Sequence, residues 1–207
     1  MDEPGLPGVI LAGGLSRRMG GGDKTLLTLG DRPVLAHVIE RLRRQVGAMA
    51  LSANGDPERF SGFGIPVVPD SEPDYPGPLA GVLAGLDWAS GCGAERIVTV
   101  AADSPFFPAN LVERLEQAAM DAPVSLAATQ VPDRGILRHP TFGLWPVALR
   151  DDLRIALRGG IRKIVVWAER HGVSLARFGS EPFDPFFNLN RPEDMLTAES
   201  ILRALRQ

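Results

Sequence analysis

The stretch LAGGLSRRMGGGDK, residues 11–24, gathers the residue types that bind an anion. It holds five glycines, two arginines and a lysine directly after the apolar run at 8–10. Glycine lets the backbone approach a ligand closely or adopt a positive φ, and the cations indicate that this ligand is negative. Each charge-assisted hydrogen bond to a phosphate contributes about 1.5–3 kcal/mol. Two or three of them from Arg17, Arg18 and Lys24 would therefore hold a triphosphate in place.

This loop differs from two common phosphate-binding patterns. The pattern G-x-G-x-x-G is absent, and Asp23 stands where the Walker pattern requires a glycine before the lysine. What remains is a set of backbone N–H groups with a local charge of +2, since Asp23 offsets one of the three cations. The alternative is a surface loop whose arginines are only solvated. The combination of residue types favours the anion site.

Acidic and amide residues follow other apolar runs. Asp103 comes directly after the run at 96–102, where a carboxylate can ligate a Mg²⁺ that bridges phosphate oxygens. The alternative for Asp103 is a carboxylate that caps a turn. Asp70 also follows a strand-like run, and Asn54 stands before a glycine. By residue type alone, a turn explains Asp70 and Asn54 as well as a binding site does.

Five further positions could touch a ligand. Asn188 and Asn190 are two residues apart in an extended stretch, so their side chains point the same way, and simple loop amides are the alternative. Gly77 and Pro78 open a predicted helix whose N–H groups could face an anion or the edge of a guanine, although helix capping alone explains them equally well. His139 precedes a proline at the start of a predicted strand, and either a site role or packing would account for it.

The elements that position these residues alternate along the first half of the chain. Apolar runs predict strands, and stretches with helical periodicity predict helices between them. The predicted strands are 8–12, 48–53, 65–70 and 96–102, and the predicted helices are 33–46, 78–90 and 108–120. Such alternation is typical of a mostly parallel sheet, in which ligands bind outside the carboxyl ends of the strands. Arg41, Arg43 and Arg44 on the first helix are expected to point mainly to water.

The second half is less regular. It predicts strands at 124–129, 139–145 and 173–178, and helices around 147–158, 161–171 and from residue 192 onward. No repeat or low-complexity linker separates the halves. We therefore expect one α/β domain over residues 1–207, with a Rossmann-like, mostly parallel sheet flanked by helices. Its first half would build the nucleotide site and its second half would complete the site.

Composition limits the other classes of function. The 207 residues are 44% hydrophobic and 23% charged, as in an ordinary globular protein. A net charge of −3 gives no general attraction to nucleic acid or to an anionic membrane. The single cysteine, Cys92, allows no intramolecular disulfide. The start MDEPGLPG lacks the features of a signal peptide, so we expect a cytoplasmic protein without a membrane or nucleic-acid partner.

Residues 11–26, LAGGLSRRMGGGDKTL, resemble a long signature of one enzyme family. The signature is L-A-G-G-x-S-x-R-M-G-G-x-D-K-x-L of the bacterial molybdenum cofactor guanylyltransferases, known as MobA, and each of its fixed positions is matched. The cytidylyltransferases of the same cofactor usually read L-A-A-G, so Gly13 favours guanine. Weaker likeness extends from residue 8 to about residue 200, including HPTFGLW at 139–145 and DPFFNLNRPEDM at 184–195.

The resemblance implies a nucleotidyltransferase fold and a reaction. Mg²⁺-bound GTP and molybdopterin, or the molybdenum cofactor, would give the guanine dinucleotide form of the cofactor and pyrophosphate. Transient contact with proteins that handle the cofactor, or with target molybdoenzymes, would follow from that role. Two alternatives stay open: cytidylyl transfer to the same acceptor, and a non-catalytic module that binds the nucleotide and the cofactor.

The resemblance also implies a role for individual residues. The residues that would contact GTP are Leu11, Ala12, Gly13, Gly14, Lys24, Asn54, Asp70 and Asp103. Those that would line the molybdopterin side are Gly77, Pro78, His139, Asn188 and Asn190. Asp103 would hold the Mg²⁺. Lys24, Asp103 and Arg18 would be the catalytic groups, with the two cations countering charge that moves onto the leaving pyrophosphate.

Overall fold

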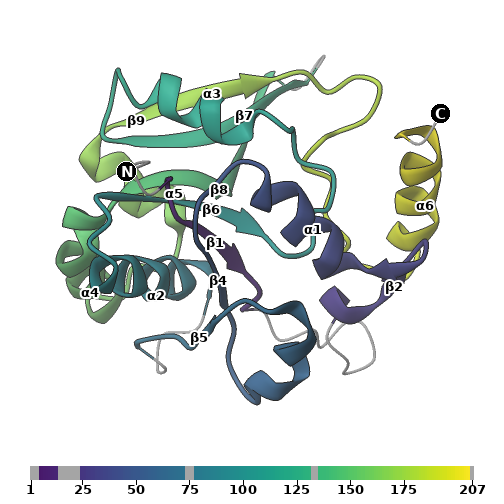
Figure 1. Ribbon diagram of the computed structural model, residues 1–207. Coiled ribbons are helices and arrows are strands. Elements are labelled where there is room, and N and C mark those ends of the chain that lie inside the picture. Colours follow the sequence, from purple (N-terminus) through teal and green to yellow (C-terminus); the bar gives the residue numbers. More distant parts are fainter. Residues whose placement is uncertain (1–4, 14–23, 73–76, 132–134, 206–207) are drawn as a thin grey trace.

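A seven-stranded sheet forms the centre of the computed structural model, which describes residues 5–13, 24–72, 77–131 and 135–205. Its strands lie in the order β5-β4-β1-β6-β8-β7-β9 (Figure 1). Their bounds are Gly8–Leu11 for β1, Met49–Ser52 for β4, Val67–Val68 for β5, Arg96–Ala101 for β6, Val124–Val131 for β7, Gly135–Pro146 for β8 and Val173–Phe178 for β9. The predicted strands are therefore all present.

One strand reverses the direction of this sheet. β8 pairs antiparallel with both β6 and β7, whereas the other neighbouring strands pair in parallel. Six of the seven strands thus share one direction, which confirms the prediction of a mostly parallel α/β sheet. The reversal follows from the chain path, because antiparallel neighbours can be joined by a short connection and parallel ones cannot.

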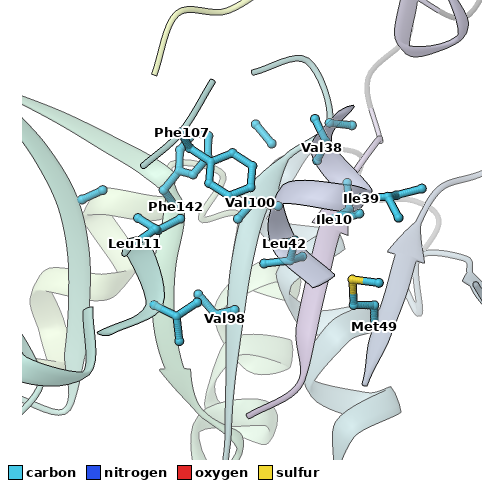
Figure 2. Packing of buried hydrophobic residues seen from close by; sticks show 14 of the residues in the cluster. Ile10, Val38, Ile39, Leu42, Met49, Val98, Val100, Phe107, Leu111 and Phe142 are labelled. Carbon is cyan, nitrogen blue, oxygen red and sulfur yellow. The ribbon is translucent and has the colours of Figure 1, made fainter. Parts of the chain in front are cut away.

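Helices cover both faces of the sheet. Successive side chains of a strand point to opposite faces, and apolar residues on both faces need a covering layer. Ile10 packs with α1 (Val34–Arg43) and α3 (Leu111–Ala118), and Figure 2 shows this cluster. Val9 and Leu11 point to the opposite face and pack with α2 (Pro78–Gly91), α4 (Arg150–Arg158) and α5 (Ile164–Ala168). Short 3₁₀ turns are Lys24–Leu26, Pro57–Phe63, Val147–Leu149 and Glu169–His171.

A third apolar cluster lies beside the sheet. The last helix, α6 (Asp194–Leu205), packs on a small hairpin formed by β2 (Thr28–Leu29) and β3 (Arg32–Pro33), as Figure 1 shows. The buried residues of this cluster are Leu29, Val34, Phe106, Leu189, Ala198 and Ile201. The sequence predicts the helix but gives no sign of the hairpin.

The prediction that the arginines of the first helix point mainly to water is wrong for one of them. Arg41 is partly buried, and its guanidinium donates a hydrogen bond to the carbonyl oxygen of Phe107 at 3.0 Å. Gln45, one turn later, donates to the carbonyl oxygen of Pro108 at 3.2 Å. These bonds fasten α1 to the segment that follows β6. Arg43 and Arg44 are exposed, as expected.

Among the helices of the described segments, none has both the length and the apolar character needed to cross a bilayer.

Close packing of α2 on the sheet gives a test of the fold. A Cβ atom at Gly85 would lie 2.9 Å from a methyl group of Val9 and 3.1 Å from one of Ile97. Gly85→Ala is therefore expected to lower the free energy of unfolding by about 1–3 kcal/mol, the usual effect of overpacking. Gly91→Ala, at the open end of the same helix, has no atom within 4 Å of the new Cβ and should be neutral or slightly stabilising. Equal urea midpoints for the two variants would contradict this close packing.

Candidate functional site

The carboxyl ends of three parallel strands bring the predicted first-half residues to one edge of the sheet. Ala12 follows β1 and its N–H donates to the carbonyl oxygen of Ser52 at 2.9 Å. Ala102, after β6, donates to the carbonyl oxygen of Leu11 at 3.1 Å. The ladder thus continues past the strand ends and fixes the segments that carry Asn54 and Asp103. The side chain of Leu11 lies in the core, so any ligand contact there would come from its backbone.

Lys24 makes the central contact at this edge. Its Nζ donates to Oδ2 of Asp103 at 2.5 Å and to Oδ1 of Asn190 at 3.1 Å. The three residues come from distant parts of the chain: the end of the glycine-rich loop, the segment after β6 and the segment before α6. The structure therefore joins predicted residues from both halves at a single ammonium group.

The segment before α6 is held against Asp103 by its backbone. The N–H of Leu189 donates to the carbonyl oxygen of Asp103 at 2.9 Å, and the Leu189 side chain is buried in the cluster under α6. The N–H groups of Asn190 and Arg191 both donate to Oδ2 of Asp194, at 2.7 and 2.8 Å, where α6 begins. With Leu189 pointing inward, the asparagines on either side of it carry exposed amides.

Asn188 has a partner of its own beside the same carboxylate. Its Oδ1 accepts a hydrogen bond from Oγ of Ser104 at 2.5 Å. Ser104 is buried and directly follows Asp103. Ser104 is not among the residues predicted from the sequence, although its position next to a candidate metal ligand was a usable signal.

Asn54 and Asp70 form a reciprocal pair. Nδ2 of Asn54 donates to Oδ2 of Asp70 at 2.6 Å, and the N–H of Asp70 donates to Oδ1 of Asn54 at 2.9 Å. The second carboxylate oxygen, Oδ1, is buried and has no hydrogen-bond partner among the described residues. Burial raises the pKa of Asp70, and the bond from Asn54 opposes that shift. Such an oxygen is suited to accept a bond from a ligand N–H.

An ion-pair network fixes the segment next to Asp70. Oγ of Ser71 donates to Asp87 of α2 at 2.5 Å. Arg154 of α4 binds both Asp87, at 2.7 Å, and Glu72, at 3.1 Å. Arg158 adds a bond to Glu72 that, with Arg154, keeps the pKa of this carboxyl low. This network was not predicted, because the sequence does not show whether a charged residue is solvated or paired with a residue of another segment.

His139 lies on β8, the strand that pairs with β6 and β7. Its Nε2 is 2.6 Å from Oγ1 of Thr129, and its ring stacks on Phe186 with 4.3 Å between the centroids. Phe186 lies within the turn at 184–187 that leads to Asn188, so the histidine supports that segment from the sheet. Packing explains His139 directly, and its predicted ligand role stays a prediction.

Burial lowers the pKa of His139, and the charge of Asp184 opposes that shift. The unfolded chain therefore takes up a proton on this ring at a higher pH than the folded protein does. Its contribution to stability is complete above the ordinary histidine pKa of about 6.5 and is lost as the pH falls below it. We expect the free energy of unfolding to decrease from pH 7.5 to pH 5, and to decrease less in His139→Gln. Urea denaturation at the two pH values measures both; an equal decrease would contradict the burial argument.

The remaining predicted residues divide into two groups. Gly77 and Pro78 stand at the start of α2, where Gly77 has a φ of 139° and its carbonyl oxygen accepts from the N–H of Ala80. Because α2 returns the chain from β5 to β6, its start lies at the same edge of the sheet as Asn54 and Asp103. Gly13 lies in open space beside this edge. Gly14 and Arg18 fall outside the described residues.

The donor atoms present fit a hard cation in type. Carboxylate and amide oxygens are what Mg²⁺ prefers, and Asp103 offers the carboxylate. Across the described segments there is no cluster of three or more His, Cys, Asp or Glu side chains that could hold a metal ion. A cation at Asp103 would therefore need most of its ligands from water or from a substrate.

A hollow of about 770 Å³ lies elsewhere on the protein. It is lined by the start of β6, the end of β8 and the segment after α3, residues 94–96, 119–123 and 146–148. The parallel strands β6 and β7 begin here and the antiparallel β8 ends here, so the hollow lies at the edge opposite the one that carries Lys24. None of the predicted site residues lines this hollow. We therefore place the candidate site at the edge where the polar groups converge, although the hollow is large.

Known proteins share the family and the fold of this chain. The model of the MobA-like NTP transferase domain matches residues 8–173. The molybdenum cofactor guanylyltransferase of Rhodopseudomonas palustris (strain BisB5) is 49% identical over 203 residues, covering 97% of this chain and 95% of that protein. Molybdopterin-guanine dinucleotide biosynthesis protein A from Archaeoglobus fulgidus superposes with a TM-score of 0.72 at 25% identity, over 96% of this chain and all of the other.

A more distant structure shares the fold. The 4-diphosphocytidyl-2C-methyl-D-erythritol synthase of Anaerococcus prevotii superposes with a TM-score of 0.76 at 16% identity, over 96% of each chain. This likeness concerns the architecture alone, and it agrees with the predicted nucleotidyltransferase type of sheet.

Proposed function

The chain belongs to the MobA-like NTP transferase family, and we propose that it transfers GMP from GTP to molybdopterin or the molybdenum cofactor. The products are the guanine dinucleotide form of the cofactor and pyrophosphate. The observation that carries the proposal is the contact of Lys24 with Asp103 and Asn190 at the carboxyl edge of the sheet. A cation, a carboxylate and an amide meet there, as phosphoryl transfer between two anionic substrates requires.

Two observations favour guanine over cytosine. The relatives with nearly half of their residues in common are named as guanylyltransferases. The partnerless oxygen of Asp70 is an acceptor, and guanine presents two adjacent N–H donors where cytosine has a single amino group. Asn54 orients this carboxylate from its other oxygen. Cytidylyl transfer is therefore not favoured.

The reaction needs no nucleophile from the protein. A terminal phosphate oxygen of the acceptor attacks the α-phosphorus of GTP, one P–O bond forms, and the bond to pyrophosphate breaks. In our proposal Lys24, together with Arg18 and the backbone of residues 11–14, binds the phosphates and counters the charge on the leaving group. Asp103 would hold a Mg²⁺, which would supply positive charge that stabilises the reacting phosphates. In the same proposal Asn188 and Asn190 position the acceptor, and Gly77, Pro78 and His139 are further residues that would contact it.

Pyrophosphate release tests the reaction. The purified protein is given molybdopterin, Mg²⁺ and each of the four nucleoside triphosphates in turn. We expect release from GTP and none when the acceptor is omitted. Equal release from CTP would instead support cytidylyl transfer, and tight binding of GTP without turnover would support a non-catalytic module. Contact with molybdoenzymes or cofactor-handling proteins, and a cytoplasmic location, stay predictions.

The two asparagines give a separate prediction. Replacing Asn188 and Asn190 together by alanine removes hydrogen bonds that contribute on the order of 1 kcal/mol each. The affinity for molybdopterin should fall about tenfold or more, while the affinity for GTP changes little. Because Asn190 also contacts Lys24, each single variant is titrated with both ligands. A comparable loss for GTP would mean that the asparagines support the whole site, and an unchanged molybdopterin affinity would make them simple loop amides.

A further inference from the structure

The ion pair between Lys24 and Asp103 occupies two groups that the proposed reaction needs elsewhere. The ammonium of Lys24 is assigned to phosphates and the carboxylate of Asp103 to a metal ion, yet here they bind each other at 2.5 Å. Both side chains are mostly buried, with exposures of 19% and 18%. Solvent and salt screen such a pair less than one on the surface. The two charges therefore cancel one another within the site.

A divalent cation that arrived alone would find little to bind. Oδ2 of Asp103 already accepts a hydrogen bond from the ammonium of Lys24. The amide oxygen of Asn190 also accepts from Lys24, and that of Asn188 accepts from Ser104. No other acidic cluster suited to a metal is present in the described parts of the chain. Mg²⁺ requires six oxygen ligands and usually takes several from substrate phosphates. The ammonium would also repel a cation placed on the same carboxylate.

We infer that the Lys24–Asp103 ion pair keeps free divalent cations out of the nucleotide-free protein, so that the site takes the metal–nucleotide complex as one ligand. The triphosphate attracts the ammonium away from Asp103, and this uncovers the carboxylate at the moment when the phosphates supply the missing ligands. Lys24 thus links metal binding to nucleotide binding. The inference rests on the proposed function, because it assumes a site for a nucleoside triphosphate and its cation.

The chain has two lysines, so the role of Lys24 in excluding free cations can be tested with the other lysine as a control. Lys24 and Lys163 are the only ones, and Lys163 is exposed directly before α5. Lys24→Met removes the ammonium but keeps an unbranched side chain, and Lys163→Met is its matched control. The paramagnetic signal of unbound Mn²⁺ reports how much of this ion the nucleotide-free protein binds.

We expect wild type and Lys163→Met to bind Mn²⁺ weakly. Lys24→Met should bind it about tenfold more tightly, because one positive charge no longer opposes the ion. The gain should vanish when Asp103→Asn is added to Lys24→Met. Binding to wild type as tight as to Lys24→Met, or a gain that survives in the double variant, would overturn the inference.

A second measurement follows Lys24 in the unmodified protein. With lysine labelled by ¹³C at the ε carbon, the two side chains give two NMR signals, and Lys163→Met assigns them. GTP with Mg²⁺ should move the Lys24 signal, and Mg²⁺ alone should leave it in place. A signal that moves as far with Mg²⁺ alone would overturn the inference while the nucleotide site stands. A signal unmoved by GTP with Mg²⁺ would overturn the proposed function itself, and the inference with it.

Discussion

Asp103→Asn is expected to lower kcat about a thousandfold at saturating GTP and ordinary Mg²⁺, with little change in shape. Asparagine has nearly the same volume but lacks the negative charge that binds Lys24 and that, in our proposal, also binds the metal ion. A bound divalent ion contributes several kcal/mol to the stabilisation of charge in a transition state, and about 4 kcal/mol corresponds to a thousandfold rate. Pyrophosphate release measures kcat, and thermal unfolding checks that the variant is folded.

The matched control for this variant is Asp121→Asn. Asp121 is exposed near the hollow at the opposite edge of the sheet, so the same chemical change there should leave turnover unaltered. Full activity of Asp103→Asn at ordinary Mg²⁺ would rule out a metal ligand at this position.

Lys24→Ala should lower kcat/KM for GTP about 10- to 150-fold. A charge-assisted bond to phosphate contributes roughly 1.5–3 kcal/mol, and it acts both in the bound substrate and in the transition state. The loss should therefore be shared between a higher KM and a lower kcat. Lys163→Ala provides the control, since that lysine lies outside the site. Unchanged kinetics for Lys24→Ala would move this lysine out of the site.

These two substitutions should not be additive. Since Lys24 and Asp103 are in direct contact, each single variant already removes the pair. The double variant is expected to lose less than the product of the two single losses, which a double-mutant cycle measures directly.

The strands and most helices could be predicted because their periodicity is a local property of the sequence. β1, β4 and β6 are short apolar runs that end before polar residues, and the structure has them where that pattern indicates. The direction of β8 could not be predicted in this way, because pairing depends on the path of the chain and not on composition. The β2–β3 hairpin spans few residues and has little apolar alternation.

The candidate site was predictable in its parts but not in its pairings. Lys24 and Asp103 each stand out by residue type and position, yet the sequence gives no sign that they bind each other across 79 positions. The bond of Lys24 to Asn190 spans 166 positions. The loop arginines that the sequence emphasises fall outside the described residues. The roles of the individual site residues, and the extent of one domain over residues 1–207, stay predictions.

The hydrogen bond from the N–H of Leu189 to the carbonyl oxygen of Asp103 has a consequence for how such a protein can evolve. This bond holds the segment before α6 against the site. Because it joins two backbone groups, it can form whatever side chains stand at the neighbouring positions. The apolar cluster beneath α6 is separate from the two clusters on the faces of the sheet. Substitutions in the last segment can therefore alter the exposed amides at 188 and 190 without repacking the core. In our proposal the amides at 188 and 190 position the acceptor, so changes in this segment would alter which acceptor is bound. Asn190 also contacts Lys24, so position 188 is the one less tied to the nucleotide chemistry.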